Sequence, residues 1–179
     1  MNKFFKIIIF LTIFPLTSFA DQYPNTSVGI IDINRVLTES KASLDASKQI
    51  EKIQTNVEAK AKDRDESIIA EREKLIEQQS IMAPEAFEVK VAEFEKNVQN
   101  YQLERQEQIR SLDQMVQDAR SKILEEVKPI LKEHSSEIGI TLVLEKNSVV
   151  LSADEMDMTD QIIKKLNKAM PKIKVEYNN

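Results

Sequence analysis

The chain has 179 residues, of which 31% are charged and 6% aromatic, with a single His, no Cys and two glycines. The lack of Cys excludes disulfide bridges and thiolate metal sites, and the formal net charge of −5 disfavours DNA or RNA as the main partner, because nucleic-acid binding needs a basic surface. A composition rich in Glu, Lys, Gln, Ala, Ile and Leu is typical of long helices and coiled coils.

Residues 1–20 have the layout of a secretory signal peptide. Two lysines precede the apolar stretch 7–16, and small residues stand before a cleavage site at Ala20. As a helix this stretch would rise about 15 Å, roughly half of a bilayer core, so it predicts a cleaved signal rather than an anchor. We expect cleavage near Ala20-Asp21, a periplasmic mature chain with 23 basic and 30 acidic residues, and at most peripheral contact with the membrane.

The interval between Gly29 and Gly139 predicts two long helices. From Lys41 to Ala83 the chain has neither Gly nor Pro and consists of strong helix formers. Pro84 suits the first turn of a second helix, which we expect to continue to about Ile138. Two helices of similar length joined by a tight turn form an antiparallel hairpin.

The two helices are expected to meet along a heptad-like apolar seam and to form an arm over 41–129 with its tip near 80–86. Pro129 should kink the second helix where the arm meets a body. Polar residues interrupt the seam at Arg64, Glu71, Arg105 and Gln108. The seam residues are Ile50, Ile53, Val57, Ala61, Ile68, Leu75 and Met82 in the first helix and Phe87, Val91, Phe94, Val98, Tyr101, Ile109, Leu112, Val116, Ala119, Ile123, Val127 and Ile130 in the second.

The segments that flank the hairpin predict short strands and a final helix. The apolar runs 28–33, 140–144 and 148–151 are expected to be buried strands, the last two joined by a hairpin turn at 145–147. Residues 157–160 are expected to cap a short amphipathic helix, which Pro171 ends. The tail, residues 171–179, carries no informative pattern.

The fold class is therefore α+β and mostly α, with a long antiparallel helical hairpin, a coiled-coil-like arm, on a small β body. The body, residues 21–40 and 130–170, is too small to bury a core alone, so we expect it to oligomerise. Closure of several copies into a ring would remove unpaired strand edges. The residues expected to form the oligomer body are Val28, Ile30, Ile31, Leu142, Leu144, Val149 and Leu151.

Two patches of sequence flank the predicted hairpin. The first is Val28-Gly-Ile-Ile-Asp32-Ile-Asn-Arg35-Val-Leu-Thr-Glu-Ser40, and the second runs from Gly139-Ile-Thr-Leu-Val-Leu-Glu-Lys-Asn147 through Val149-Val150-Leu151 to Asp157-Met-Thr159-Asp160. Both patches resemble the Skp (OmpH) family of periplasmic chaperones. Together with the hairpin between them, they extend the resemblance over residues 28–167.

The resemblance implies a homotrimer whose β body carries three helical arms around a cavity. It also implies that the chain binds unfolded outer-membrane proteins and prevents their aggregation. The chain departs from the family in charge, because members are often basic whereas residues 48–96 contain 9 basic and 12 acidic side chains.

No pattern in the sequence points to an enzyme. His134 is the only histidine and reads as an ordinary helix residue, because a catalytic triad or a His metal site needs more partners. There is no glycine-rich loop to cradle a phosphate, so we expect no nucleotide, metal or other cofactor. Asp32 and Arg35 could contact a client or another subunit. We favour helix capping for Asp32, and for Asp157 and Thr159.

The candidate client-binding residues lie around the outer half of the arm. Most of them also fit the seam, but Ile69 and Ile76 broaden the stripe of the first helix, and Val89 and Leu103 lie off the seam of the second. The predicted set is Ile68, Ile69, Leu75, Ile76, Met82, Phe87, Val91, Phe94 and Leu103. Many weak apolar contacts would hold an unfolded chain without ATP. The alternative is an envelope structural or adaptor protein whose hairpin spans a gap or binds a partner coiled coil.

Overall fold

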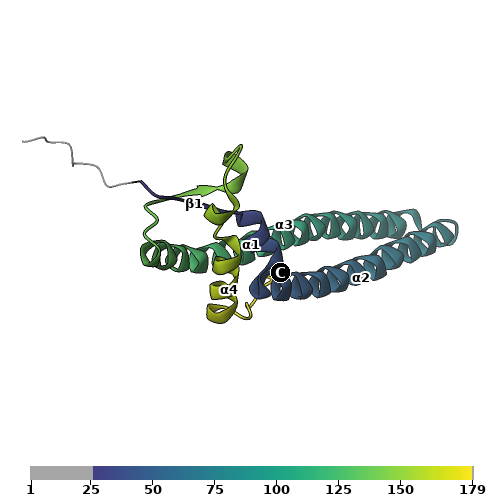
Figure 1. The fold of residues 1–179 in the computed structure, drawn as a ribbon. Helices are drawn as coiled ribbons and strands as arrows, with labels where there is room; N and C mark the ends of the chain where they lie inside the picture. The colour runs from purple at the N-terminus through teal and green to yellow at the C-terminus, as the bar shows by residue number, and fades with distance from the viewer. Residues whose placement is uncertain (1–25, 179) are drawn as a thin grey trace, which may run out of the picture.

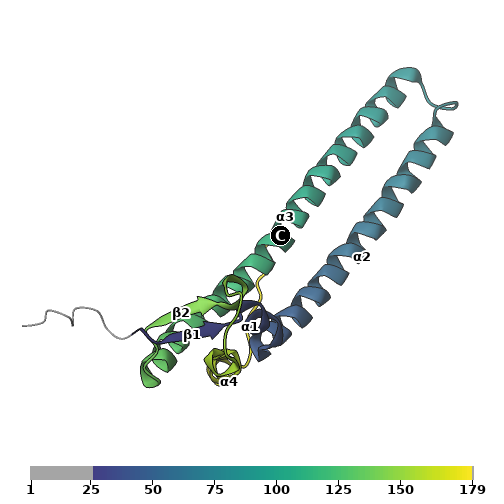
Figure 2. The same cartoon turned by 45° about the horizontal axis from the view of Figure 1, so that its top comes forward.

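The structure, a computed structural model, describes residues 26–178, so the predicted signal peptide lies outside the described residues. A long two-helix arm projects from a small body (Figure 1, Figure 2). The elements are β1 (Val28–Ile31), α1 (Ile33–Glu39), α2 (Lys41–Gln78), α3 (Pro84–Glu137), β2 (Leu142–Glu145), the 3-10 turns η1 (Lys146–Ser148) and η2 (Asp154–Met156), and α4 (Thr159–Ala169). The predicted fold class is confirmed. Within this part of the chain, every helix is too short or too polar to cross a membrane.

The helix boundaries follow the predicted start signals more closely than the predicted ends. Asp32 accepts a hydrogen bond from the Arg35 N–H at 3.0 Å and so caps α1, as expected. Pro84 is at the start of α3, which then runs unbroken through Pro129. The first long helix ends at Gln78, earlier than the predicted Ala83, and the intervening residues form the turn at the arm's tip.

The sheet has two parallel strands, with Val28 opposite Leu142 and Ile31 opposite Glu145. The predicted third strand and its hairpin turn are wrong. Residues 146–148 form the turn η1, and 149–151 pair with no strand among the described residues. An apolar run becomes a strand only where a neighbouring edge satisfies its backbone. After η2 the chain instead reaches the other edge of β1, where the Met158 N–H donates to the Ile30 carbonyl at 2.9 Å.

The core lies where β1, α1 and α4 pack against the root of the arm. Small side chains at Ala42, Ala46 and Ala119 allow α2 and α3 to approach closely there. The larger buried members of this cluster are Ile31, Val36, Ile123, Val127, Ile130, Met158, Ile162, Leu166 and Ile173. β1 is buried as predicted, whereas β2 presents its leucines to solvent in the single chain, because nothing in the described residues covers its outer side.

The two glycines occupy positions where a side chain would have a cost. A Cβ atom on Gly29 would lie 2.8 Å from the end of the Met158 side chain and 3.2 Å from Ile140, so these side chains would have to shift. Gly139 has a φ of +73° just after α3, and the Ile140 N–H bonds the Ser135 carbonyl at 2.8 Å to close the helix end.

A hydrogen-bonded chain of side chains joins the start of α4 to β1. The Asp32 N–H donates to the Thr159 hydroxyl at 2.9 Å, and the Asp157 carboxylate accepts from the Thr159 N–H at 2.9 Å and from Lys146 Nζ at 2.7 Å. The predicted capping role is wrong in detail, because Met158 is the N-cap of α4 and makes no side-chain cap bond. Asp157 precedes the cap and bonds the Thr159 N–H, while the Thr159 side chain links two segments distant in sequence. Burial raises the pKa of the Asp157 carboxyl, but the hydrogen bonds from Lys146 and Thr159 outweigh it and lower the pKa from 3.8 to about 2.

We expect Asp157→Asn to destabilise the protein by up to about 2 kcal/mol at pH 7. Because the folded-state pKa lies below the unfolded one, this stabilisation is present above about pH 4 and is lost as the pH falls towards 2. Urea unfolding followed by circular dichroism at fixed protein concentration measures the difference at each pH. Asp154→Asn, at an exposed nearby carboxylate, serves as the control, and a difference as large at pH 2 as at pH 7 would contradict the assignment.

Candidate functional site

The seam between α2 and α3 is half-buried along most of the arm. Of its predicted members, Ile109 and Val116 are wrong. Ile109 is 53% exposed, whereas Met115, which sequence reasoning missed, is 2% exposed. Successive helical residues point about 100° apart, so a shift of one position moves a side chain off the contact face. The seam here runs through Gln108, Leu112 and Met115, so it includes a polar residue that the sequence analysis treated as an interruption.

A polar cluster crosses the middle of the arm. Asn97 accepts a hydrogen bond from Arg64 and donates one to Glu71 Oε2 at 2.9 Å, so both predicted interruptions of α2 meet one side chain of α3. The Arg64 guanidinium also lies 5.9 Å from the centre of the Tyr101 ring. The Tyr101 hydroxyl donates to the Ala61 carbonyl at 3.0 Å. Asn97 was missed because an amide beside the apolar stripe gives no periodic signal.

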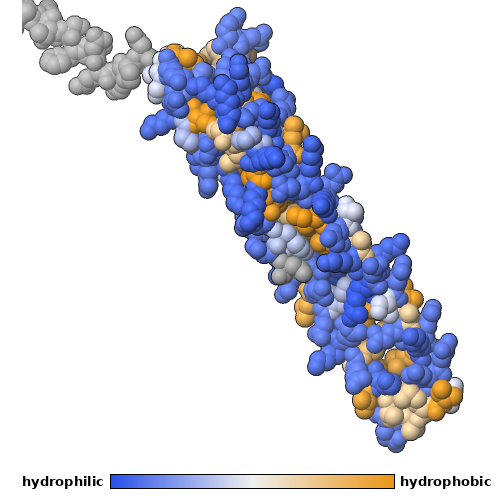
Figure 3. All heavy atoms as spheres, turned by 90° about the horizontal axis from the view of Figure 1, so that it is seen from below, coloured by the Kyte–Doolittle hydropathy of each residue, from blue (hydrophilic) through white to orange (hydrophobic). Residues whose placement is uncertain are grey.

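The arm exposes separate apolar side chains on its outer surface (Figure 3). Three residues of the predicted client-binding set face solvent: Ile69, Ile76 and Leu103 are 57%, 59% and 60% exposed. The other six line the half-buried seam and are Ile68, Leu75, Met82, Phe87, Val91 and Phe94. The set is therefore not one contiguous patch. Charged residues surround most of the exposed members, as the blue surface of the arm in Figure 3 shows.

The tip of the arm gathers further apolar surface. Ile81 lies in the turn between α2 and α3 and is 80% exposed, and Ala83 and Pro84 beside it are exposed as well. Figure 3 shows hydrophobic and weakly hydrophobic side chains together at this end. The sequence analysis did not single out Ile81. An isoleucine in a predicted solvent-exposed turn was the available signal.

The outer edge of the body is also apolar. Leu142 and Leu144 on β2 are exposed, and Val150 and Leu151 after η1 are almost fully exposed. Val150 was missed, although it belongs to the same run as Leu151. The remaining residues of the predicted oligomer body separate into two groups. Ile30 and Ile31 are buried in the chain's own core, and Val28 and Val149 are half-buried.

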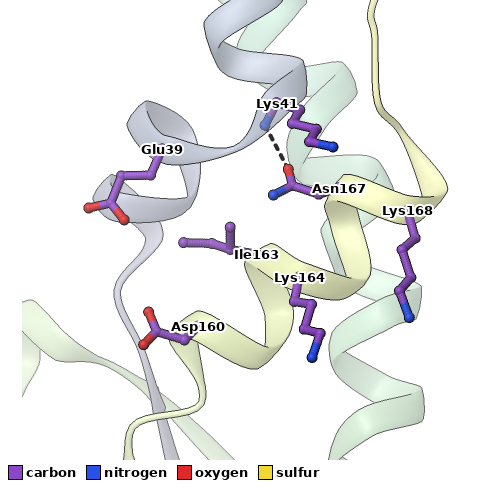
Figure 4. A pocket seen from close by; sticks show the side chains of 7 residues that line it. All are labelled: Glu39, Lys41, Asp160, Ile163, Lys164, Asn167 and Lys168. Carbon is purple, nitrogen blue, oxygen red and sulfur yellow. Dashed lines mark hydrogen bonds between the residues drawn. The ribbon is translucent and has the colours of Figure 1, made fainter.

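An open hollow of 480 Å³ lies between α1, the start of α2 and α4 (Figure 4). Two of its acidic residues are paired with Arg35, which bonds Glu39 at 2.8 Å and Asp160 at 2.9 Å. These bonds raise the pKa of Arg35 and lower that of Glu39. Asn167 accepts from the Lys41 N–H at 2.6 Å. These polar groups hold three helices together, which gives Arg35 a structural role.

Residues 26–178 contain no group of three or more His, Asp or Glu side chains that could hold a metal ion. His134 is half-buried in α3, and its Nδ1 lies 3.4 Å from Glu137 Oε2. Hydrogen bonds from Lys165 and His134 lower the pKa of Glu137. The side chains best placed for function are thus the apolar ones of the arm and of the β2 edge.

Comparisons with known proteins identify a family and solved structures of similar fold. The model of the family described as outer membrane protein (OmpH-like) matches residues 27–166. No curated protein matches the chain in sequence. A crystal structure from Caulobacter crescentus CB15, described as that of an OmpH-like outer membrane chaperone, superimposes with a TM-score of 0.80. That chain is 17% identical, and the match covers 88% of the present chain and 93% of the other.

We expect Asn97→Ala to loosen the arm and leave the body intact. The substitution removes two hydrogen bonds across the seam and leaves Arg64 and Glu71 without their shared partner, which should cost about 1 kcal/mol locally. Hydrogen exchange should become faster for amides near residues 60–75 and 90–105, with β1 and β2 unchanged. Asn100→Ala, at an exposed position one turn away, is the matched control, and equal protection in both variants would contradict a role for the cluster.

Proposed function

The chain belongs to the OmpH-like outer membrane protein family, and on this premise we propose that it is an ATP-independent periplasmic chaperone of the Skp family. It binds unfolded outer-membrane proteins in a cavity between helical arms and prevents their aggregation. The observation that carries this proposal is the arm itself. Helices of 38 and 54 residues extend from the body, their seam is half-buried, and their outer surface exposes scattered isoleucines and leucines.

Such a surface suits weak and reversible binding of many sequences. Full burial of an Ile or Leu side chain contributes about 1.5–3 kcal/mol, and partial burial contributes correspondingly less. One contact is therefore too weak to hold a client. Several contacts made at once raise the effective concentration of the remaining ones, and each can dissociate separately. A client that buries its own apolar groups elsewhere then leaves without nucleotide hydrolysis.

Charge plays a smaller part in the proposed binding. Residues 48–96, which comprise most of α2, the tip and the start of α3, carry 9 basic and 12 acidic side chains, so they offer no net positive field for an acidic client. The mixed charges keep the arm soluble while its apolar side chains make contacts. Apolar burial therefore has to supply most of the affinity.

We further propose that the bodies of three chains assemble into a homotrimer that holds the arms around the cavity. A two-stranded sheet is marginal by itself, and β2 presents an edge with exposed leucines. Pairing of this edge with another copy of the chain would bury the exposed leucines together with Val150 and Leu151. It would also give the unpaired backbone groups of the edge hydrogen-bond partners.

Replacing Ile69, Ile76 and Leu103 together with Ser should reduce the holding of unfolded clients several-fold while the oligomer remains. These side chains are exposed, so their loss removes client contacts and little of the seam. The assay is light scattering of a urea-unfolded β-barrel protein diluted into stoichiometric chaperone without nucleotide. The matched control replaces the exposed residues Ala70, Glu77 and Gln102 with Ser. Aggregation suppression equal to that of the unmodified chain would count against the proposed contacts, and its absence in the unmodified chain would count against the function.

Replacing Leu144 and Leu151 with Asp should dissociate the oligomer. Charges at an apolar interface lose solvation without gaining partners, so we expect a shift from the trimer to the monomer mass at micromolar concentration. Multi-angle light scattering after size exclusion measures the mass. Leu44→Asp changes a comparably exposed leucine at the root of α2 and should leave the mass unchanged. A trimer that survived both Asp substitutions would place the interface elsewhere.

A further inference from the structure

The C-terminal tail lies in a groove at the root of the arm. Residues 170–178 follow α4 and run up along the arm in Figure 2. They lie outside the family match, which ends at residue 166. Ile173 is 8% exposed and belongs to the same buried cluster as Ala46 of α2 and Ile123 of α3. Val175 packs against the edge of this cluster. The tail that carried no informative pattern in the sequence is therefore a packed segment.

Two side chains of α2 bind the main chain of the tail. The Ile173 N–H donates to Asp45 Oδ2 at 3.1 Å, the Gln49 amide donates to the Ile173 carbonyl at 2.7 Å, and the Val175 N–H donates to Gln49 Oε1 at 3.3 Å. Gln49 is itself oriented by a 2.8 Å bond to Asp45. Asp45 and Gln49 stand one turn apart on the same face. On the side of the tail, these bonds involve backbone groups only, so any extended segment could form them.

The tail alternates in the way that an amphipathic strand does. Ile173 and Val175 point into the cluster, whereas Lys174 and Glu176 between and after them are exposed and paired with each other at 2.9 Å. Lys122 on α3 lines the other side of the groove, with Glu125 and Glu126. The groove therefore combines sequence-independent backbone contacts with apolar sites for alternate side chains, which is how β-strand recognition sites achieve affinity and selectivity.

We propose that this groove, formed by Asp45 and Gln49 of α2 and by α3 around Ile123, is a peptide-binding site for extended segments of alternating apolar and polar residues, and that the chain's own tail occupies it as a competitor. In its choice of partner the inference rests on the proposed function, because strands of β-barrel outer-membrane proteins have this alternating pattern. The tethered tail has an effective concentration of the order of millimolar, so it excludes single segments present at micromolar concentration.

The test measures binding of a fluorescent peptide with the sequence of residues 170–179 to the full mature chain by anisotropy. In the unmodified chain the tethered tail should block the peptide. In a full-length variant with Ile173→Ser and Val175→Ser the tail is loosened, and the peptide should bind at least tenfold more tightly. Adding Gln49→Ala to this variant should weaken binding at least fivefold, whereas Gln54→Ala, at an exposed position of α2, should not.

Equal peptide binding by the loosened and unmodified chains, or no effect of Gln49→Ala, would overturn the inference. If the double substitution disturbs folding by circular dichroism, Val175→Pro removes one of the tail's N–H donors and is used with the same readout. A strand peptide from a β-barrel protein should compete with the labelled peptide, and a peptide carrying Ser at both apolar positions should not. Failure of the strand peptide to compete would overturn the partner class.

The two proposals can fail separately. The peptide assay uses the chain's own tail and needs no client, so it can succeed even if the chain does not suppress aggregation. Aggregation suppression by the unmodified chain, measured beside it, would in turn stand even if the groove bound no peptide.

Discussion

The strand β1 is held along both of its edges, and the rest of the architecture depends on this. On one side it pairs in parallel with β2, and on the other the Ile30 carbonyl accepts from the Met158 N–H just before α4. Parallel strands need a long crossover between them. Here the crossover is the whole of α1, α2 and α3, so the arm emerges from the body as the connection between two paired strands. Gly29 leaves room on β1 for the end of the Met158 side chain, which a larger residue would displace.

The body is more densely packed than the outer half of the arm. At the root, alanines and branched side chains of α2, α3 and α4 are buried together. Further out only Ala61 is buried, and the contact between the helices depends on half-buried residues and on the Arg64–Asn97–Glu71 cluster. Segments with few buried contacts open most readily. An arm with a well-packed root and a loosely packed outer half is consistent with the proposed binding of clients of different shape.

Much of this fold could be predicted from the sequence, because glycine and proline mark its boundaries. The stretch without either residue, the position of Pro84 and the cap at Asp32 are local signals, and the structure has helices that begin there. Ile109 and Val116 were misassigned because two polar residues, Arg105 and Gln108, occupy seam positions. A search for apolar periodicity alone does not assign polar residues to the seam. The prediction of a third strand is wrong for another reason, because strand formation depends on a partner that the sequence does not identify. Asn97 and the tail contacts likewise depend on partners distant in sequence.

Under the two proposals, the arm and the groove at its root would offer different kinds of contact to an unfolded chain. The outer arm presents exposed apolar side chains, so the proposed binding there would depend on buried apolar area alone. Asp45 and Gln49 present fixed polar groups, and these complement main-chain atoms in an extended conformation. An unfolded membrane protein exposes both apolar side chains and unpaired backbone groups. In this structure the chain's own tail supplies main-chain partners for both of these half-buried side chains, beyond the bond that they make with each other.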